Sequence, residues 1–175
     1  MSVVINGSAG VTTNSGAVYD GIQSGTAQAS TSGTSIDFTG IPSWVKRITV
    51  MFSGVSSSST SNYLVQLGDS GGIENTGYTS AASRLAATAA STATSTAGFN
   101  IKSDAASSVN SGSMLITNVN GNTWCANHAL GSQATTDTMV GGGSKTLSDT
   151  LTQVRITTVN GTYTFDAGSI NILYE

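Results

Sequence analysis

The chain has 175 residues, enough for one domain with a substantial core and too few for two full-sized domains. Ser, Thr and Gly supply about 75 of these residues, whereas charged residues make up 9%, far below the roughly 25% of an average soluble protein. Six scattered basic residues and a net charge of -3 exclude a basic patch for nucleic acid, and no apolar run approaches the roughly 20 residues that span a bilayer.

Residues 1–21 differ from the rest of the chain because they are thin in large apolar side chains. The run "SVVI" ends at Asn6-Gly7, a turn dipeptide, and "GVTT" at 10–13 is its expected strand partner. So few apolar side chains cannot form a core alone. We therefore expect an extended docking arm over 1–21 and a folded domain over 22–175. The arm's candidate contacts with another protein are Val3, Val4, Ile5, Val18 and Tyr19.

The stretch "IDFTGIPSWVKRITVMFSGV" at 36–55 contains the only proline of the chain, Pro42, and one of its two tryptophans. Pro42 cannot donate a hydrogen bond to a β-ladder and therefore belongs in a turn or at a strand edge. After it, Ile48, Val50 and Phe52 alternate with polar residues and Met51, the period of a strand with one buried face. The pattern predicts a loop that contains Trp44 and leads into a core strand.

Strand-like segments recur along the remaining chain, whereas no segment has convincing helical periodicity. The alanine-rich stretch at 80–98 is predicted as loop plus one strand, because its Ser and Thr residues oppose helix. Asn120-Gly121 and Asn160-Gly161 each predict a hairpin with a type I′ turn. The sequence thus predicts an all-β fold, an antiparallel, jelly-roll-like β-sandwich. Its clearest strands are 46–55, 62–68, 112–119, 123–130, 152–159, 162–166 and 168–174.

No combination of residues in the sequence predicts an enzyme. His128 is the only histidine, and it lies within a strand pattern without a "GxSxG" motif elsewhere. Cys125, the only cysteine, is expected to be buried, and its spacing of three from His128 predicts that the two side chains point to opposite faces of the strand. The segments "DSGGIE" at 69–74 and "GGGSK" at 141–145 are expected to be turns rather than a calcium loop and a phosphate loop. We therefore expect no catalytic residue, no metal and no cofactor.

Aromatic side chains are the remaining candidates for ligand contact, because sugar rings stack on them. Most should pack in the core, since they supply large buried area in a chain with only 6% aromatic residues. Trp44, in the loop beside Pro42, is the best candidate for partial exposure. We take Trp44 and Tyr78 as candidate glycan contacts.

Two blocks of the sequence resemble a domain that recurs in virion proteins of tailed bacteriophages. They are "GTAQASTSGTSIDFTGIPSWVKRITVMFSGVS" at 25–56 and the closing "VRITTVNGTYTFDAGSINILYE", with "YLVQLG" and "AGFNI" between them. This domain often forms the distal end of tail-fibre-like proteins. The resemblance covers residues 25–175 and implies a virion structural protein, but it carries over no catalytic residues. Because only about two dozen residues precede the first block, a head fibre, a capsid decoration protein or a small tail-tip adhesin are alternatives to a tail fibre.

From these observations we expect a virion protein that is made in the bacterial host cytoplasm and that binds other capsid or tail proteins. The habit of viral fibres and an expected exposed edge at the last strand both favour a homotrimer. Recognition of a host-surface glycan is the alternative function.

Overall fold

The computed structural model describes residues 21–103, 105–106, 108–132 and 134–175 with their side chains, and the backbone of 3–6, 10–13 and 16–17. Every regular element in these residues is a β-strand, which confirms the predicted all-β class. No helix in this part of the chain is long and apolar enough to cross a membrane.

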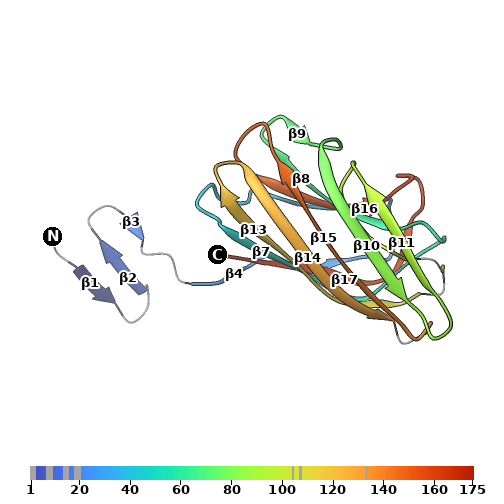
Figure 1. Ribbon diagram of the computed structural model, residues 1–175. Helices are drawn as coiled ribbons and strands as arrows, with labels where there is room; N and C mark the ends of the chain where they lie inside the picture. The colour runs from blue at the N-terminus through green and yellow to red at the C-terminus, as the bar shows by residue number, and fades with distance from the viewer. Residues whose placement is uncertain are drawn as a thin grey trace.

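The strands from 23 onward form two antiparallel sheets that pack against each other (Figure 1), so the predicted β-sandwich is confirmed. In spatial order, the larger sheet contains β11 (Ala90–Ser95), β10 (Tyr78–Leu85), β15 (Asp137–Thr146), β14 (Thr123–Ser132), β13 (Asn110–Asn120), β7 (Arg47–Ser57), β17 (Phe165–Tyr174) and β4 (Gln23–Ser24), with β5 (Gln28–Ala29) also beside β17. The smaller sheet contains β12 (Phe99–Ile101), β8 (Tyr63–Asp69), β16 (Gln153–Thr158) and β6 (Ser35–Thr39), with β9 (Gly72–Ile73) beside β8.

The core lies between the two sheets and is built from alternate residues of the long strands. On β7, Ile48, Val50 and Phe52 are buried, as their period-two spacing predicts. The smaller sheet contributes, among others, Leu67 and Ile156, which are fully buried. Burial of these apolar side chains is the main favourable term that holds the two sheets together.

The predicted loop before β7 is confirmed, and it is closed by backbone hydrogen bonds. β6 ends at Thr39, and the Val45 N–H then donates to the Pro42 carbonyl at 3.1 Å. The N–H groups of Lys46 and Arg47 both donate to the Glu175 carbonyl, at 2.7 and 2.8 Å. The last residue of the chain therefore fixes the entrance of β7.

Of the two Asn-Gly pairs with predicted type I′ turns, one joins a hairpin and the other does not. Asn120-Gly121 joins β13 to β14. A type I′ turn needs positive φ at both central residues, but Thr136 is the only described non-glycine residue with positive φ. The predicted turn type is therefore wrong. Asn160-Gly161 connects β16 of the smaller sheet to β17 of the larger one, so the predicted hairpin is wrong. The Asn160 side chain instead accepts hydrogen bonds from the backbone N–H groups of 162 and 163 and holds this connection.

The glycines of "GGGSK" lie in the middle of β15 and not in a turn, which corrects the prediction. Their lack of a side chain is required by the strands on either side. A Cβ on Gly143 would lie 2.2 Å from the Thr79 carbonyl oxygen, and one on Gly141 would lie 2.5 Å from the His128 ring. Such contacts are too short for any real Cβ, so this strand fits between β10 and β14 because it contains glycine.

The alanine-rich stretch at 80–98 forms two paired strands, β10 and β11, instead of the predicted loop and single strand. The hairpin closes where the Ala86 N–H donates to the Ala89 carbonyl at 2.9 Å. "DSGGIE" does form the expected glycine-rich turn, between β8 and β9.

The last strand, β17, covers the predicted segment 168–174 and begins at Phe165, with an irregularity at Gly168, where φ is +90°. The predicted strand 162–166 is wrong for residues 162–164, which lie in the connection before β17. It pairs with β7 on one side and with β4 and β5 on the other. The expected exposed edge at the C-terminal strand is therefore wrong, because β4 and β5 cover it.

At the N-terminus, β1 (Val3–Asn6), β2 (Gly10–Thr13) and β3 (Gly16–Ala17) form a separate three-stranded sheet. β1 and β2 pair antiparallel with Asn6 opposite Gly10, which confirms the expected partner of the first run. The first strand of the larger sheet, β4, begins at Gln23.

Candidate functional site

The predicted docking residues lie only in part within the described residues. Val3, Val4 and Ile5 are three consecutive positions of β1. Val18 and Tyr19 lie outside the described residues. The docking role of these five residues therefore stays a prediction.

Tyr78 is a core residue, so its prediction as a glycan contact is wrong. Only 2% of its surface is exposed, and its hydroxyl accepts a hydrogen bond from the Leu67 N–H at 2.6 Å. Its ring packs edge-on against Phe99, with centroids 5.1 Å apart, and the Lys145 ammonium lies 5.3 Å from its centre. Burial raises the pKa of the hydroxyl well above its ordinary value. No face of this ring is left for a sugar.

Trp44 lies at the surface end of the core, half-buried in the loop before β7. Its ring lies 6.1 Å from that of Tyr174, at a tilt of 49°. The two aromatic residues come from opposite ends of the folded domain's sequence and meet because β17 pairs with β7. Trp44 thus remains a candidate contact, with a second aromatic residue, Tyr174, beside it.

A groove of about 390 Å³ runs beside Tyr174, between the edges of the two sheets. One wall is the segment from Gly25 to Gln28, which lies along β17, and the other is the end of β6 with the loop that follows it. Gly25 permits this close approach, because a Cβ there would lie 2.9 Å from the Ile172 side chain. The volume of the groove is in the range of small-molecule sites.

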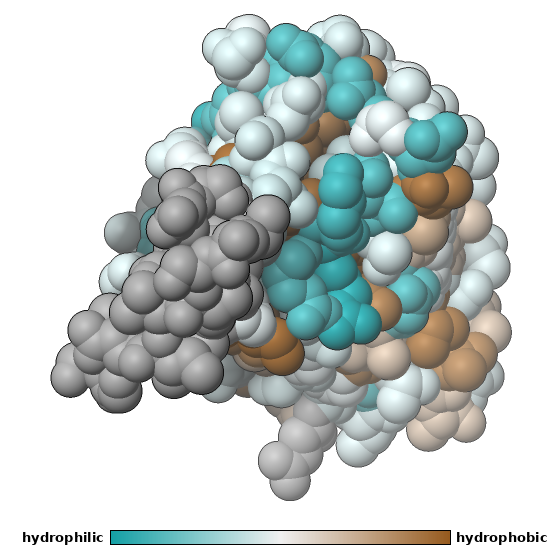
Figure 2. Space-filling view, turned by 90° about the vertical axis from the view of Figure 1, so that its left-hand side faces the viewer, coloured by the Kyte–Doolittle hydropathy of each residue, from teal (hydrophilic) through white to brown (hydrophobic). Residues whose placement is uncertain are grey.

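The polar rim of the groove is held in place by the protein itself. Arg155 binds the Asp37 carboxylate with two hydrogen bonds of 2.7 Å, and the Gln28 amide donates to the Asp37 carbonyl at 2.7 Å. Thr26 and Thr39, one on each wall of the groove, are exposed residues that carry hydroxyl groups. An aromatic side chain beside a few fixed polar groups is typical of ligand-binding pockets. Figure 2 shows the neighbouring end of the molecule, where hydrophilic side chains gather with apolar ones among them.

A second hollow, of about 800 Å³, lies over the ends of β13, β14 and β15. It is larger and more open, but none of the described residues in its walls is aromatic; they are Val109, Ser111, Gly131, Ser132, Ala134, Thr136, Asp137 and Thr138. We therefore favour the groove beside Tyr174 as the candidate site.

The two acidic residues of the β8–β9 hairpin, Asp69 at the end of β8 and Glu74 just after β9, are already bound by protein groups. Asp69 accepts hydrogen bonds from the Gly71 N–H at 2.8 Å and the Ser148 hydroxyl at 2.6 Å, and the Ser148 bond is the main cause of its lowered pKa. Burial by itself would raise the pKa of Glu74, but Lys145 and Ser148 lower it overall. Among the described residues, no three His, Cys, Asp or Glu side chains are close enough together to hold a metal. This cluster joins β15 to the β8–β9 turn.

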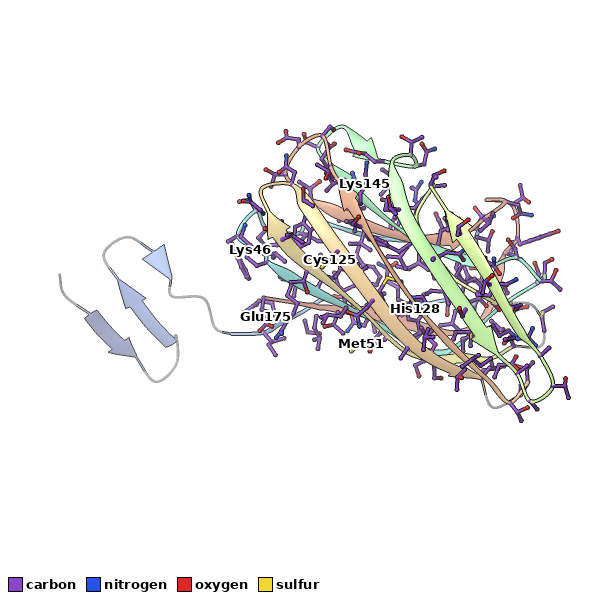
Figure 3. All side chains as sticks on the ribbon, viewed as in Figure 1. Lys46, Met51, Cys125, His128, Lys145 and Glu175 are labelled. Carbon is purple, nitrogen blue, oxygen red and sulfur yellow. The ribbon has the colours of Figure 1, made fainter. Side chains whose placement is uncertain are left out.

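Cys125 and His128 lie on opposite faces of β14, as their spacing predicts (Figure 3). The predicted burial of the cysteine is wrong, because Cys125 is exposed on the outer face of the sheet. His128 is 4% exposed, its Nε2 has no hydrogen-bond partner among the described residues, and burial lowers its pKa to about 4. The two side chains cannot act together on one substrate.

Comparison of the chain with protein-family models, with curated proteins and with solved structures gives no match.

Proposed function

We propose that the protein is a structural component of a bacteriophage virion, in which the β-sandwich is displayed on the particle surface. The observation that carries this proposal is where the two blocks with phage resemblance lie. They supply β7 and β17, which pair from Ile48 opposite Tyr174 to Phe52 opposite Ile170 in the larger sheet. The resembling residues thus lie side by side in one sheet of the folded unit. Tail fibre, head fibre and capsid decoration protein are the positions compatible with a domain of this size, and imaging of the intact particle distinguishes them.

Residues 1–21 are proposed to attach the protein to the particle. Support comes from the strand pairing, because among the described residues β1, β2 and β3 pair with one another and with no strand of the sandwich. An edge strand such as β1 can add to an exposed sheet of another protein. Its contact candidates are Val3, Val4, Ile5, Val18 and Tyr19.

Deletion of residues 2–21 tests this attachment. We expect a soluble, β-rich protein that no longer incorporates into particles. A variant in which the same residues are replaced by an equally long Gly/Ser segment is the matched control, and we expect it to fail as well. Normal occupancy of either variant on virions would show that attachment runs through the sandwich and contradict the proposal.

The homotrimer remains a prediction that rests on the resemblance to viral fibres. Its physical argument, an exposed last strand, does not hold, because β17 is covered on both sides. Light scattering of the purified protein measures the mass directly, and a monomer at micromolar concentration would contradict the trimer.

A second candidate function is recognition of a host-surface glycan, favoured by the groove beside Tyr174, whose ring lies 6.1 Å from that of Trp44. A glycan array probed with the wild-type protein, with Tyr174→Ala in the groove and with Trp44→Ala beside it tests this function. Since Tyr174 supplies an aromatic ring to the wall of the groove, we expect at least about a tenfold loss of binding in Tyr174→Ala. Tyr163→Ala, which removes an exposed tyrosine that does not line the groove, is the control and should bind normally. If no glycan on the array binds, the glycan-recognition function is contradicted, whereas the structural role is unaffected.

A further inference from the structure

β11 forms one edge of the larger sheet (Figure 1), and its residues are alternately exposed and half-buried. In the part of the chain that the structure describes, it pairs with β10 alone. Natural proteins protect such edges with charged residues, proline or bulges, because free backbone groups recruit other strands. Residues 85–101 contain no charged residue and no proline, and the register with β10 is regular throughout. This edge has none of the usual protection.

The other edges of the sandwich differ. On the far side of the larger sheet, β4 and β5 are two residues long each. In the smaller sheet, β12 has three residues, and the β6 edge carries Asp37 with its partner Arg155. The six residues of β11 are thus the longest run of uncharged edge in the described sheets.

The hydrogen-bonding pattern shows which residues of β11 face outward. The Ala86 N–H bonds to the Ala89 carbonyl, and residues that exchange hydrogen bonds recur at every second position of an antiparallel ladder. In the observed register, Ser91, Ala93 and Ser95 therefore bond toward β10. The backbone N–H and C=O groups of Thr92 and Thr94 point away from the sheet.

The sequence of β11 is symmetric about Ala93. Ser91, Thr92, Ala93, Thr94 and Ser95 read the same in both directions. A two-fold axis at Ala93 would place Thr92 opposite the partner's Thr94, and the outward backbone groups of these residues would exchange four hydrogen bonds across the contact. Ala93 would face its own copy in the closer, non-hydrogen-bonded pair, where a small side chain fits.

We propose that β11 is a self-association edge that pairs antiparallel with β11 of a second copy of this chain. The inference does not depend on a virion role. The contact joins chains in pairs, so it gives a dimer by itself, and it would link two trimers where a threefold contact also forms. A contact of this length falls at the small end of specific interfaces, below about 1,200 Å² in total, and is expected to form at high local concentration.

Paired charge variants test the proposal and its register. Thr92→Lys with Thr94→Lys places like charges opposite each other across the two-fold axis, whereas Thr92→Lys with Thr94→Glu places opposite charges there. Both double variants change the same two exposed residues, whose neighbours on β10 are Ser83 and Ala81. Circular dichroism checks that both are folded.

In sedimentation velocity over a concentration series at low salt, we expect the measured mass of the wild type to approach that of an even number of chains. The Lys/Lys variant should keep half that mass at every concentration, and the Lys/Glu variant should regain the full mass. Added salt should narrow the difference between the two variants. A wild type that stays monomeric or trimeric, or a Lys/Lys variant that associates like the wild type, would overturn the proposal. Equal failure of both variants would overturn the register.

Discussion

Protonation of His128 should make the stability of the sandwich depend on pH. Its ring lies on the inner face of β14, and its cross-strand neighbours, Met114 on β13 and Gly141 on β15, carry no charge. Burial lowers its pKa to about 4 from an ordinary value of 6.5. Between these two values the unfolded chain binds a proton and the folded chain does not. The stabilising contribution is therefore complete above pH 6.5 and is lost as the pH falls toward 4.

The magnitude follows from the same two pKa values. Each pKa unit corresponds to about 1.4 kcal/mol, so protonation should lower the free energy of unfolding by about 2.5 kcal/mol between pH 7.5 and 4.5. That is a large part of the 5 to 15 kcal/mol typical of a whole domain. The carboxylates of Asp69 and Glu74, whose pKa values are lowered, also lose stabilisation as the pH falls, so the wild-type pH profile alone does not isolate the histidine.

Urea unfolding of the wild type and of His128→Gln, each at pH 7.5 and 4.5, separates the two contributions. The variant keeps both carboxylates but has no titrating ring, so it should lose about 2.5 kcal/mol less than the wild type over this interval. The comparison uses the change with pH, so an overall destabilisation of the variant does not affect it. Equal losses in the two proteins would refute a neutral, buried histidine.

Three further substitutions check the packing described above. Gly141→Ala should destabilise the fold by about 1 to 3 kcal/mol in urea unfolding, because its Cβ would meet His128 and the Ala81 carbonyl; Gly131→Ala, which has open space, is the control and should change little. Glu74→Gln leaves the buried Lys145 without its charged partner and should cost about 3 kcal/mol, whereas loss of the more exposed Asp37–Arg155 pair through Asp37→Asn should cost under about 1 kcal/mol. Cys125→Ser should change stability by less than about 0.5 kcal/mol, and the native thiol should react with a disulfide reagent, since it is exposed; a thiol that reacts only after unfolding would contradict its position.

Features that depend on neighbouring residues could be predicted from the sequence. The alternation along β7 predicts which of its side chains are buried, because successive residues of a strand point to opposite faces. The same period separates Cys125 from His128, although it does not determine which of the two faces the core. Pro42 and Trp44 are correctly expected in a loop, because proline lacks the N–H that a central strand requires.

The candidate site could be predicted only in part. Trp44 was identified from its loop, but it only neighbours the groove. The groove itself is formed by Tyr174 and the segment from Gly25 to Gln28, which the pairing of β17 with β4 and β5 brings together, and by the end of β6. Tyr78 was assigned to the surface, and its burial is decided by Phe99 and Leu67 of the smaller sheet.

The sequence by itself determined the all-β class of this protein, its lack of helical pattern and the alternation of its core residues, because these follow from side-chain chemistry over a few neighbouring positions. Only the tertiary structure decided which strands distant in the sequence pair. Asn160-Gly161 has the composition of a hairpin turn yet crosses between sheets, and "GGGSK" has that of a turn yet forms the centre of β15. In each case a contact distant in sequence prevails over the local preference: β17 gains a long ladder with β7, and β15 fits between β10 and β14 only without side chains at Gly141 and Gly143.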